Sequence, residues 1–380
     1  MVFINVRNVE RSVVVASKRI TLLISSLAGG GAEGVCVNVA NGLADHGWQV
    51  DLLVLHTNNS AYLKRVSRKV NLVVLGVNHA RQAPLPLLRY IRQHKPEKML
   101  VFNYELAVLA VMLRSLFRFK TKIIARNINT FSKNTTQPQG IWQRYIVTPL
   151  INHFYGKCDH IINQCQAMRD DLISVFPHLE DKTSVIYNPV AKHVEDYAKA
   201  HDLIQVEKQD YLLCVGRLEK QKAFHYAIES FAGIANDFPT LRLKIVGKGS
   251  LEQSLKQCAI DFRVADRVDF EGFQVDMIPY YLHAKTTLLT SLYEGFPNVL
   301  IESITLGTPV VAFDCPSGPR EIIQDGVNGY LVEYLSVQDL QDEMKKLLIK
   351  KIDSTSVKMS TKLYRLKTVV EHYSITLSCI

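Results

Sequence analysis

RITLLISSLAGGGAEG, at residues 19–34, joins an uncharged apolar run to a glycine-rich turn. The run from Ile20 to Ile24 is typical of a strand buried on both faces, because no charged residue interrupts it. After the turn, apolar residues recur at helical spacing and predict a helix from about Ala32 to His46. A buried strand, a tight turn and a helix are the repeating unit of doubly wound sheets, so the stretch predicts the α/β class.

The same alternation continues along the chain in two series, separated by a polar segment at residues 191–210. Further strands are predicted at residues 50–55, 71–75, 98–102, 122–125, 159–163 and 184–190, and then at 211–216, 241–247, 268–270, 285–290 and 309–313. Helices of the second series are predicted near residues 224–238, 251–259 and 298–306. We therefore predict two Rossmann-like domains with doubly wound parallel sheets, whose strand ends face each other across an interdomain cleft. The predicted division is 1–190, a linker at 191–210, 211–350, and a helical tail at 351–380.

Basic residues are concentrated in the first half of the chain. Residues 1–190 contain 23 Lys and Arg against 11 Asp and Glu, whereas residues 191–380 contain 22 against 25. We expect an anionic partner, and cations mixed with apolar residues fit an anionic membrane surface. The alternative interpretation is a basic face that is exposed to solvent and has no partner. Nucleic acid is not expected, because zinc-ligand spacing and RNA-binding signatures are missing. The cluster comprises Arg81, Arg89, Arg92, Lys95, Lys98, Arg114, Arg118, Lys120, Lys122 and Arg126.

The cysteines and the chain start both favour a cytoplasmic location. The 7 cysteines are scattered, odd in number and never spaced as C-x-x-C, which is typical of reduced thiols. Charged residues interrupt residues 1–18, so no signal-peptide core is predicted there. The longest apolar run, Leu106 to Leu113, is too short to cross a bilayer. We expect contact with a membrane only from its surface, at the inner face of the cytoplasmic membrane.

The glycine turn from Gly29 to Gly34 has the arrangement of an anion site. It follows a strand and opens a helix, so backbone amides near Gly30 and Gly31 could receive a phosphate. The turn also matches G-x-G-x-x-G, but the next strand ends in Leu55-His56-Thr57 without the acid that a dinucleotide site needs. Besides an anion site and a dinucleotide site, a third interpretation is a tight turn whose only role is to pack the helix against the strand.

Two cations follow the first strand of the second series. Gly216 ends that strand, and Arg217 and Lys222 come next. Such cations can neutralise a departing diphosphate without a metal. The chain has no D-x-D pair to hold a divalent ion, so no metal is expected. Two ordinary surface cations are the alternative.

The segment SLYEGFPNVLIES, residues 291–303, combines two carboxylates with a helix start. Glu294 lies before the predicted helix and Glu302 within it, so both can converge on vicinal hydroxyls of one ligand. Gly295 permits close approach of backbone to a ligand. The amides from Asn298 to Leu300, after Pro297, form a phosphate site at a helix N-terminus. Glu302 as a solvated helix charge is the alternative.

These motifs together resemble glycosyltransferase family 4 over residues 19–350. The resemblance also rests on Asn188-Pro189, the segment 314–321 (DCPSGPRE) and the segment 325–329 (DGVNG). It implies the GT-B fold and a retaining, metal-free transfer of a sugar, usually from a UDP-sugar, which serves as a co-substrate and not as a cofactor. The leaving phosphate is expected to act as base for the acceptor hydroxyl.

The resemblance also implies roles for individual residues. Catalysis is expected from Glu294, Arg217 and Lys222. Glu302 is expected to bind the ribose, and the backbone around Phe273 the base. Many family members carry a His where this chain has Arg126 and Asn127, so the role of that position is open. The complete expected donor site is Gly30, Gly31, Asn188, Gly216, Arg217, Lys222, Gly247, Phe273, Glu294, Gly295, Phe296, Pro297, Asn298, Val299, Leu300 and Glu302.

The acceptor is predicted from the phrase around Cys315-Pro-Ser-Gly-Pro-Arg-Glu321, which looks like bacterial members that build lipid-linked oligosaccharides, capsule or O-antigen. We expect a glycan acceptor linked to polyprenyl diphosphate. Two other functions stay open: a UDP-sugar epimerase of the same architecture, and a noncatalytic protein that binds sugar nucleotides.

Overall fold

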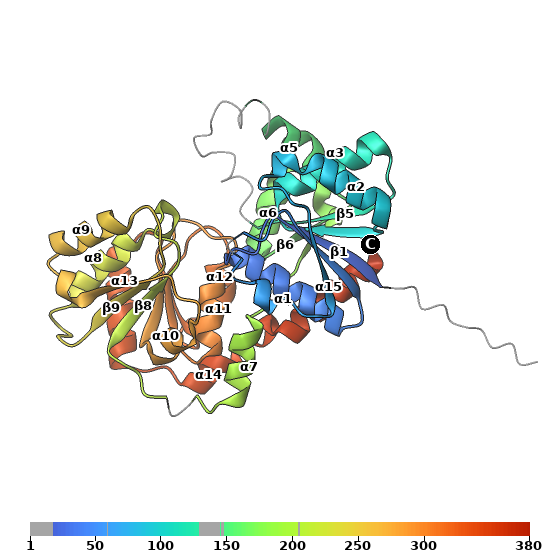
Figure 1. Ribbon diagram of the computed structural model, residues 1–380. Coiled ribbons are helices and arrows are strands. Elements are labelled where there is room, and N and C mark those ends of the chain that lie inside the picture. The colour runs from blue at the N-terminus through green and yellow to red at the C-terminus, as the bar shows by residue number, and fades with distance from the viewer. Residues whose placement is uncertain (1–17, 59, 129–144, 146–147, 204–205) are drawn as a thin grey trace, which may run out of the picture.

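The apolar runs of the sequence form two parallel sheets, one in each domain (Figure 1). The computed structural model describes residues 18–58, 60–128, 145, 148–203 and 206–380. The prediction about a signal peptide concerns a segment that lies almost entirely outside these residues. Both sheets are all-parallel and covered by helices, which confirms the predicted α/β class with two Rossmann-like domains.

The N-terminal sheet has seven strands in the order β3-β2-β1-β4-β5-β6-β7. Its strands are β1 (Arg19–Ile24), β2 (Gln49–Val54), β3 (Val70–Val74), β4 (Lys98–Val101), β5 (Lys122–Arg126), β6 (His160–Asn163) and β7 (Thr183–Val185). The helices of this half are α1 (Gly31–Asp45), α2 (Pro84–His94), α3 (Tyr104–Phe117), α5 (Thr148–Phe154) and α6 (Gln166–Val175), and α7 (Lys192–Ala200) follows and packs on the C-terminal core. Strand order reverses between β1 and β4, and ligands of such sheets bind at this switch point.

The C-terminal sheet has six strands in the order β10-β9-β8-β11-β12-β13. Its strands are β8 (Tyr211–Val215), β9 (Arg242–Val246), β10 (Val268–Gly272), β11 (Thr286–Leu289), β12 (Val310–Phe313) and β13 (Gly329–Val332). Its helices are α8 (Phe224–Ile234), α9 (Glu252–Asp261), α10 (Ile278–His283), α11 (Asn298–Thr305), α12 (Pro319–Ile322), α13 (Val337–Ile349) and α14 (Ser354–Met359). Here the order reverses between β8 and β11. The loops after β1 and β8 therefore both leave a switch point.

Alternating residues of β1 show how the N-terminal sheet has a hydrophobic core on each of its two faces. Ile20, Leu22 and Ile24 pack under α1, whereas Leu23 packs on the opposite face with α2 and α3. All of these side chains are buried. A strand without charged residues is thus buried on both sides, as the sequence predicts.

The structure adds detail to two segments of the division predicted from the sequence. The polar segment 191–210 contains helix α7, whose Val194 and Ala198 are buried. The last helix, α15 (Leu366–Cys379), returns to the first domain and packs beside α1. A Cβ added at Gly42 would lie 2.3 Å from Val370 Cγ2, so the two helices approach closely there. The chain end is therefore part of the N-terminal core (Figure 1).

Candidate active site

The glycine turn after β1 leaves the N-terminus of α1 open to a ligand. Gly30 is the N-cap residue, and no side chain caps the first amides of the 15-residue helix. The Glu33 carboxylate lies beside the turn, since a Cβ added at Gly30 would be 2.4 Å from Glu33 Oε2. Backbone amides and the helix dipole favour an anion at Gly30 and Gly31.

The loop after β8 requires glycine at two positions. Gly247 has φ +145°, and a Cβ on it would lie 1.8 Å from the carbonyl oxygen of Gly216. A Cβ on Gly216 would lie 2.9 Å from Lys222 Cε. The two glycines thus let neighbouring strand ends and the Lys222 side chain pack together. Arg217, which begins this loop, is exposed and forms no ion pair within the described chain.

Lys222 and Glu294 form a buried ion pair at the ends of two neighbouring strands. Lys222 Nζ lies 2.5 Å from Glu294 Oε1, with 14% and 9% of the two side chains exposed. The Ser291 hydroxyl donates to the same carboxylate oxygen at 2.6 Å. The side chain of Gln221 donates to the Tyr293 carbonyl oxygen at 2.9 Å and ties the two loops together. The predicted diphosphate cation and sugar-binding carboxylate therefore share one site.

Helix α11 begins directly after this carboxylate, with Pro297 as its N-cap and no side-chain cap. Asn298 is the first helical residue, and its side chain accepts a hydrogen bond from Asn188 Nδ2 at 2.7 Å. Phe296 and Leu300 are buried in the core, where the Phe296 ring packs on Tyr187. Any contact of these two residues with a ligand would therefore be made by their backbone. Val299 is partly buried against the same core.

Glu302 lies about one turn inside α11, next to the hydroxyl of Tyr281. Tyr281 Oη donates to Glu302 Oε2 at 3.3 Å. Burial raises the pKa of the Glu302 carboxyl to about 7, although the tyrosine and the charge of Arg65 oppose the rise. A carboxylate whose charged form is disfavoured by burial can be stabilised by hydroxyl donors of a ligand. This property fits the expected binding of a ribose diol.

The two domains bring these elements face to face. A Cβ on Gly31 would lie 3.4 Å from Asn298 Nδ2, and one on Gly29 would lie 3.9 Å from Phe273 Cζ. One on Gly295 would lie 2.8 Å from the Ile128 carbonyl oxygen. Figure 1 shows α11 and α12 on the side of the C-terminal domain that faces α1 and α6. Three features thus meet at the interdomain junction: the glycine turn, the N-terminus of α11 at Asn298 (the α11 tip), and the exposed Phe273.

Positions 126 and 127, whose role the sequence leaves open, hold a buried cation and a buried amide side chain. Arg126 is 1% exposed and donates to Tyr373 and Asn188. Asn127 is 5% exposed and donates to Asn163 Oδ1 at 3.2 Å. Both side chains are engaged inside the N-terminal domain, so neither is placed as a free group at the junction.

Sequence reasoning missed a carboxylate that joins the domains. Glu321 of α12 accepts hydrogen bonds from the backbone amides of Gln166 and Ala167, at 2.9 Å and 3.0 Å. These are the first amides of α6, whose N-cap Cys165 makes no side-chain cap. In the sequence Glu321 stands out only as part of the segment 314–321, and the start of α6 without a capping side chain is the other signal. The C-terminal domain therefore caps a helix of the N-terminal domain.

Metal ligands do not gather in the described part of the chain. Among residues 18–58, 60–128, 145, 148–203 and 206–380, no three His, Cys, Asp or Glu side chains could hold one ion. The metal-free reaction stays a prediction. In the same residues, no helix combines the length and the apolar character that spanning a membrane requires.

Comparison with known proteins identifies the family of each half of the chain. Residues 29–193 match the family described as Glycosyltransferase Family 4, and residues 198–364 match the family described as Glycosyl transferases group 1. Amylovoran biosynthesis glycosyltransferase AmsD of Erwinia amylovora is 26% identical over 335 residues, covering 87% of this chain and 90% of that protein. A Campylobacter jejuni enzyme, N-acetylgalactosamine-N,N'-diacetylbacillosaminyl-diphospho-undecaprenol 4-alpha-N-acetylgalactosaminyltransferase, is 28% identical over 251 residues, covering 63% of this chain and 64% of that enzyme.

A solved structure of similar fold is that of Anabaena Alr3699/HepE in complex with UDP. It superposes with a TM-score of 0.76 at 19% identity, covering 95% of this chain and 100% of that chain. Likeness at this identity establishes the fold, and the fold is GT-B. With residues 29–193 and 198–364 both matched by glycosyltransferase families, this chain belongs to glycosyltransferase family 4 and is a glycosyltransferase.

Proposed function

We propose that this enzyme transfers a hexose or N-acetylhexosamine from a UDP-sugar to a polyprenyl-diphosphate-linked glycan, in the biosynthesis of a surface polysaccharide. The observation that carries the proposal is the buried Lys222–Glu294 pair beside the N-terminus of α11, which no side chain caps. Relatives support it: a Campylobacter transferase is named for an undecaprenol-linked acceptor, and Alr3699/HepE was solved with UDP-glucose.

The chemistry requires that the sugar–phosphate bond breaks and that the diphosphate leaves with its electron pair. In the proposed mechanism, Arg217, Lys222 and the α11 amides neutralise the charge that develops on the diphosphate. Glu294 positions the sugar and Glu302 holds the ribose. The departing phosphate oxygen takes the proton of the acceptor hydroxyl, which attacks from the same face and retains the configuration. The proposed reaction does not use a metal ion.

A panel of nucleotide sugars tests the proposal, read by melting temperature and by product analysis. Ligand binding raises stability by RT ln(1 + [L]/Kd), so a UDP-sugar at 100 times its Kd should stabilise the protein by about 2.7 kcal/mol. If no nucleotide sugar shifts the melting temperature, the donor assignment is wrong. A rearranged sugar formed from donor alone would support an epimerase, and binding without any turnover would support a sensor.

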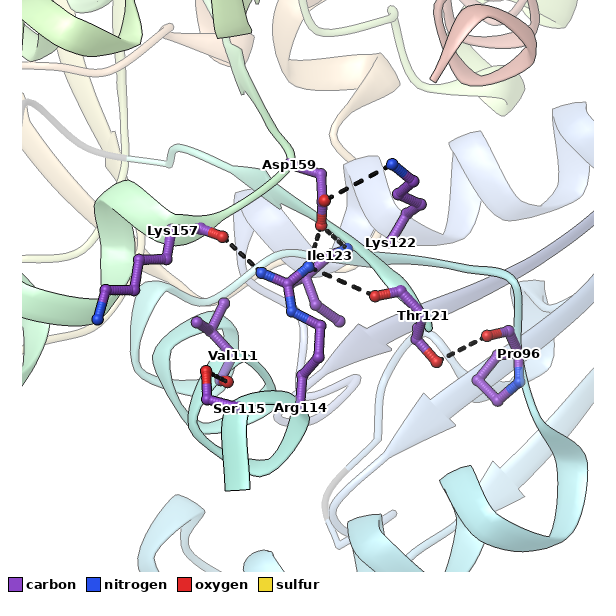
Figure 2. Close-up of polar contacts among 9 residues, drawn as sticks. All are labelled: Pro96, Val111, Arg114, Ser115, Thr121, Lys122, Ile123, Lys157 and Asp159. Carbon is purple, nitrogen blue, oxygen red and sulfur yellow. Dashed lines mark hydrogen bonds and ion pairs between the residues drawn. The ribbon is translucent and has the colours of Figure 1, made fainter. Parts of the chain in front are cut away.

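We also propose that the enzyme docks on the inner face of the cytoplasmic membrane through a surface on α2 and α3. The predicted basic cluster is smaller in the structure than in the sequence. Figure 2 shows that Asp159 pairs with both Arg114 and Lys122, and Arg114 also donates to the Lys157 carbonyl oxygen. Lys98 Nζ donates to the Leu377 carbonyl oxygen, and Arg126 is buried.

The remaining cations lie on or beside the same two helices as several exposed apolar side chains. Leu85, Leu116 and Phe117 are 73%, 73% and 37% exposed, and the Arg92 guanidinium lies 4.9 Å from the Phe117 ring centroid. We call this surface the basic-apolar patch; it consists of Arg81, Leu85, Arg89, Arg92, Leu116, Phe117, Arg118 and Lys120, all exposed. Apolar side chains between cations fit the headgroup region of an anionic leaflet.

Reversing two charges of this patch should weaken vesicle binding. At about 1 kcal/mol per basic residue, Arg89→Glu/Arg92→Glu should lower partitioning onto phosphatidylglycerol vesicles about 30-fold or more, measured by sedimentation. The matched control is Lys350→Glu/Lys351→Glu, an equal charge change on exposed residues of the other domain. Equal binding by the two double variants would contradict a docking role for the patch.

A further inference from the structure

Arg126 is a buried cation with no countercharge among the residues that the structure describes. It lies at the end of β5 with 1% of its surface exposed, and its Nη1 atom has no hydrogen-bond partner in this part of the chain. No Asp or Glu of the described ranges forms an ion pair with it. A charged group buried in this way is costly, so its presence is not explained by stability.

The guanidinium connects three separate parts of the chain. Its Nε donates to the Tyr373 hydroxyl of α15 at 2.5 Å, and its Nη2 donates to Asn188 Oδ1. Its centre lies 5.3 Å from the Phe102 ring centroid, at the end of β4. The returning C-terminal helix and two strand ends therefore hold the group in one orientation.

This contact determines which way the Asn188 amide points. An arginine can only donate, so the oxygen of Asn188 must face it and the NH2 group must face away. That NH2 group donates to Gln164 Oε1 at 3.2 Å and to Asn298 Oδ1 at 2.7 Å. Gln164 is fixed from its other end, because its Nε2 donates to the Asn127 carbonyl oxygen at 3.0 Å.

The orientation of the Asn188 amide also fixes the orientation of the Asn298 side-chain amide at the N-terminus of α11. Because Asn298 Oδ1 accepts from Asn188, its NH2 group turns toward the glycine turn, where a Cβ on Gly31 would lie 3.4 Å from Asn298 Nδ2. The junction therefore presents an N–H donor, and not a carbonyl acceptor, beside the amides of the α1 N-terminus. A donor at this place favours an anionic group.

We propose that Arg126 is a positioning residue, which acts through the Asn188 and Asn298 amides to present an N–H donor to the diphosphate of the sugar nucleotide. The inference rests on the proposed function, since it assigns a further contact to the same donor site. Arg126 itself touches no ligand in this arrangement.

The variant Asn188→Asp distinguishes a role in orienting the Asn298 amide from a role in stabilising the fold. The new carboxylate gives Arg126 its missing countercharge but offers only acceptors to Asn298, so the Asn298 amide must turn its oxygen toward Gly31. We expect a melting temperature at or above that of the parent chain together with a Kd for UDP about tenfold higher, measured by calorimetric titration. A merely structural role would move stability and affinity in the same direction.

Arg126→Lys is the second variant, because lysine also only donates. It should lower the melting temperature yet keep the Kd for UDP within about threefold of the parent value, since the amide orientation is retained. Unchanged UDP affinity in Asn188→Asp, or a tenfold loss in Arg126→Lys, would overturn the inference. If the parent chain binds no UDP, the proposed function itself fails, which is a different result.

Discussion

Replacing Lys222 by alanine should lower kcat about 100-fold or more, because a departing diphosphate loses a cation placed where its charge develops. Arg217→Ala should act in the same direction. Arg217 is exposed and has no ion pair within the described chain, so its loss should leave the melting temperature nearly unchanged. The measurement is single-turnover release of UDP from the donor that the panel identifies.

The Lys222 variant also needs a control for folding. Removing the ammonium leaves the buried Glu294 carboxylate without its cation, and breaking a buried pair costs about 3–5 kcal/mol. The double variant Lys222→Ala/Glu294→Gln should recover stability but not turnover. Exposed Lys220, two residues away, is the matched control, and Lys220→Ala should keep full activity. Unchanged turnover in Lys222→Ala would refute the assigned role.

Donor affinity should depend on pH through Glu302. Burial raises the pKa of the Glu302 carboxyl from 4.5 to about 7, so the neutral acid is the favoured form below pH 7. The stability contribution of this group is fully present below about pH 4.5 and is lost as pH rises toward 7. Ribose hydroxyls that donate to the carboxylate favour the charged form, so binding releases a proton near neutral pH.

The expected result is a Kd for a UDP-sugar that rises about tenfold for each pH unit below 7. UDP-glucose is a suitable probe, because its diphosphate has no ionisation in this range. Glu302→Gln should bind more weakly at pH 8 but show a nearly flat profile. Titration calorimetry in two buffers of different ionisation enthalpy detects the released proton. A flat profile in the parent chain would show that Glu302 does not meet the donor.

The elements with strong local signals could be predicted from the sequence. The strand, turn and helix of residues 19–46 follow from an uncharged run and three consecutive glycines, and the structure places β1 and α1 there. The helix after Pro297 was predicted from a proline and an apolar face, and α11 begins at Asn298. In these cases local pattern and tertiary packing favour the same conformation.

Other elements depend on contacts that the local pattern does not contain. Strand β13, Gly329 to Val332, was missed because it is short and begins with glycine, yet pairing with β12 makes it the sheet edge. Helix α7 was interpreted as linker because most of its residues are polar, and only its buried stripe packs on the second core. Tertiary packing decides both elements.

The motifs were sufficient to name the site residues, but they did not predict which of these residues contact one another. Lys222 and Glu294 are 72 residues apart, and their pairing follows from the order of β8 and β11 in the sheet. Arg126 was expected to belong to a basic surface or to the junction, whereas the return of α15 buries it against Tyr373. Sequence spacing alone does not reveal contacts between residues so far apart along the chain.

Product analysis tests the central claim most directly. The enzyme is incubated with a UDP-sugar, labelled in the sugar, and with a polyprenyl-diphosphate-linked glycan. The proposed function predicts that label appears in the acceptor in equal amount to released UDP, and that this transfer is lost in Lys222→Ala. Label that stays in the nucleotide as a rearranged sugar, or transfer that persists without Lys222, would contradict it.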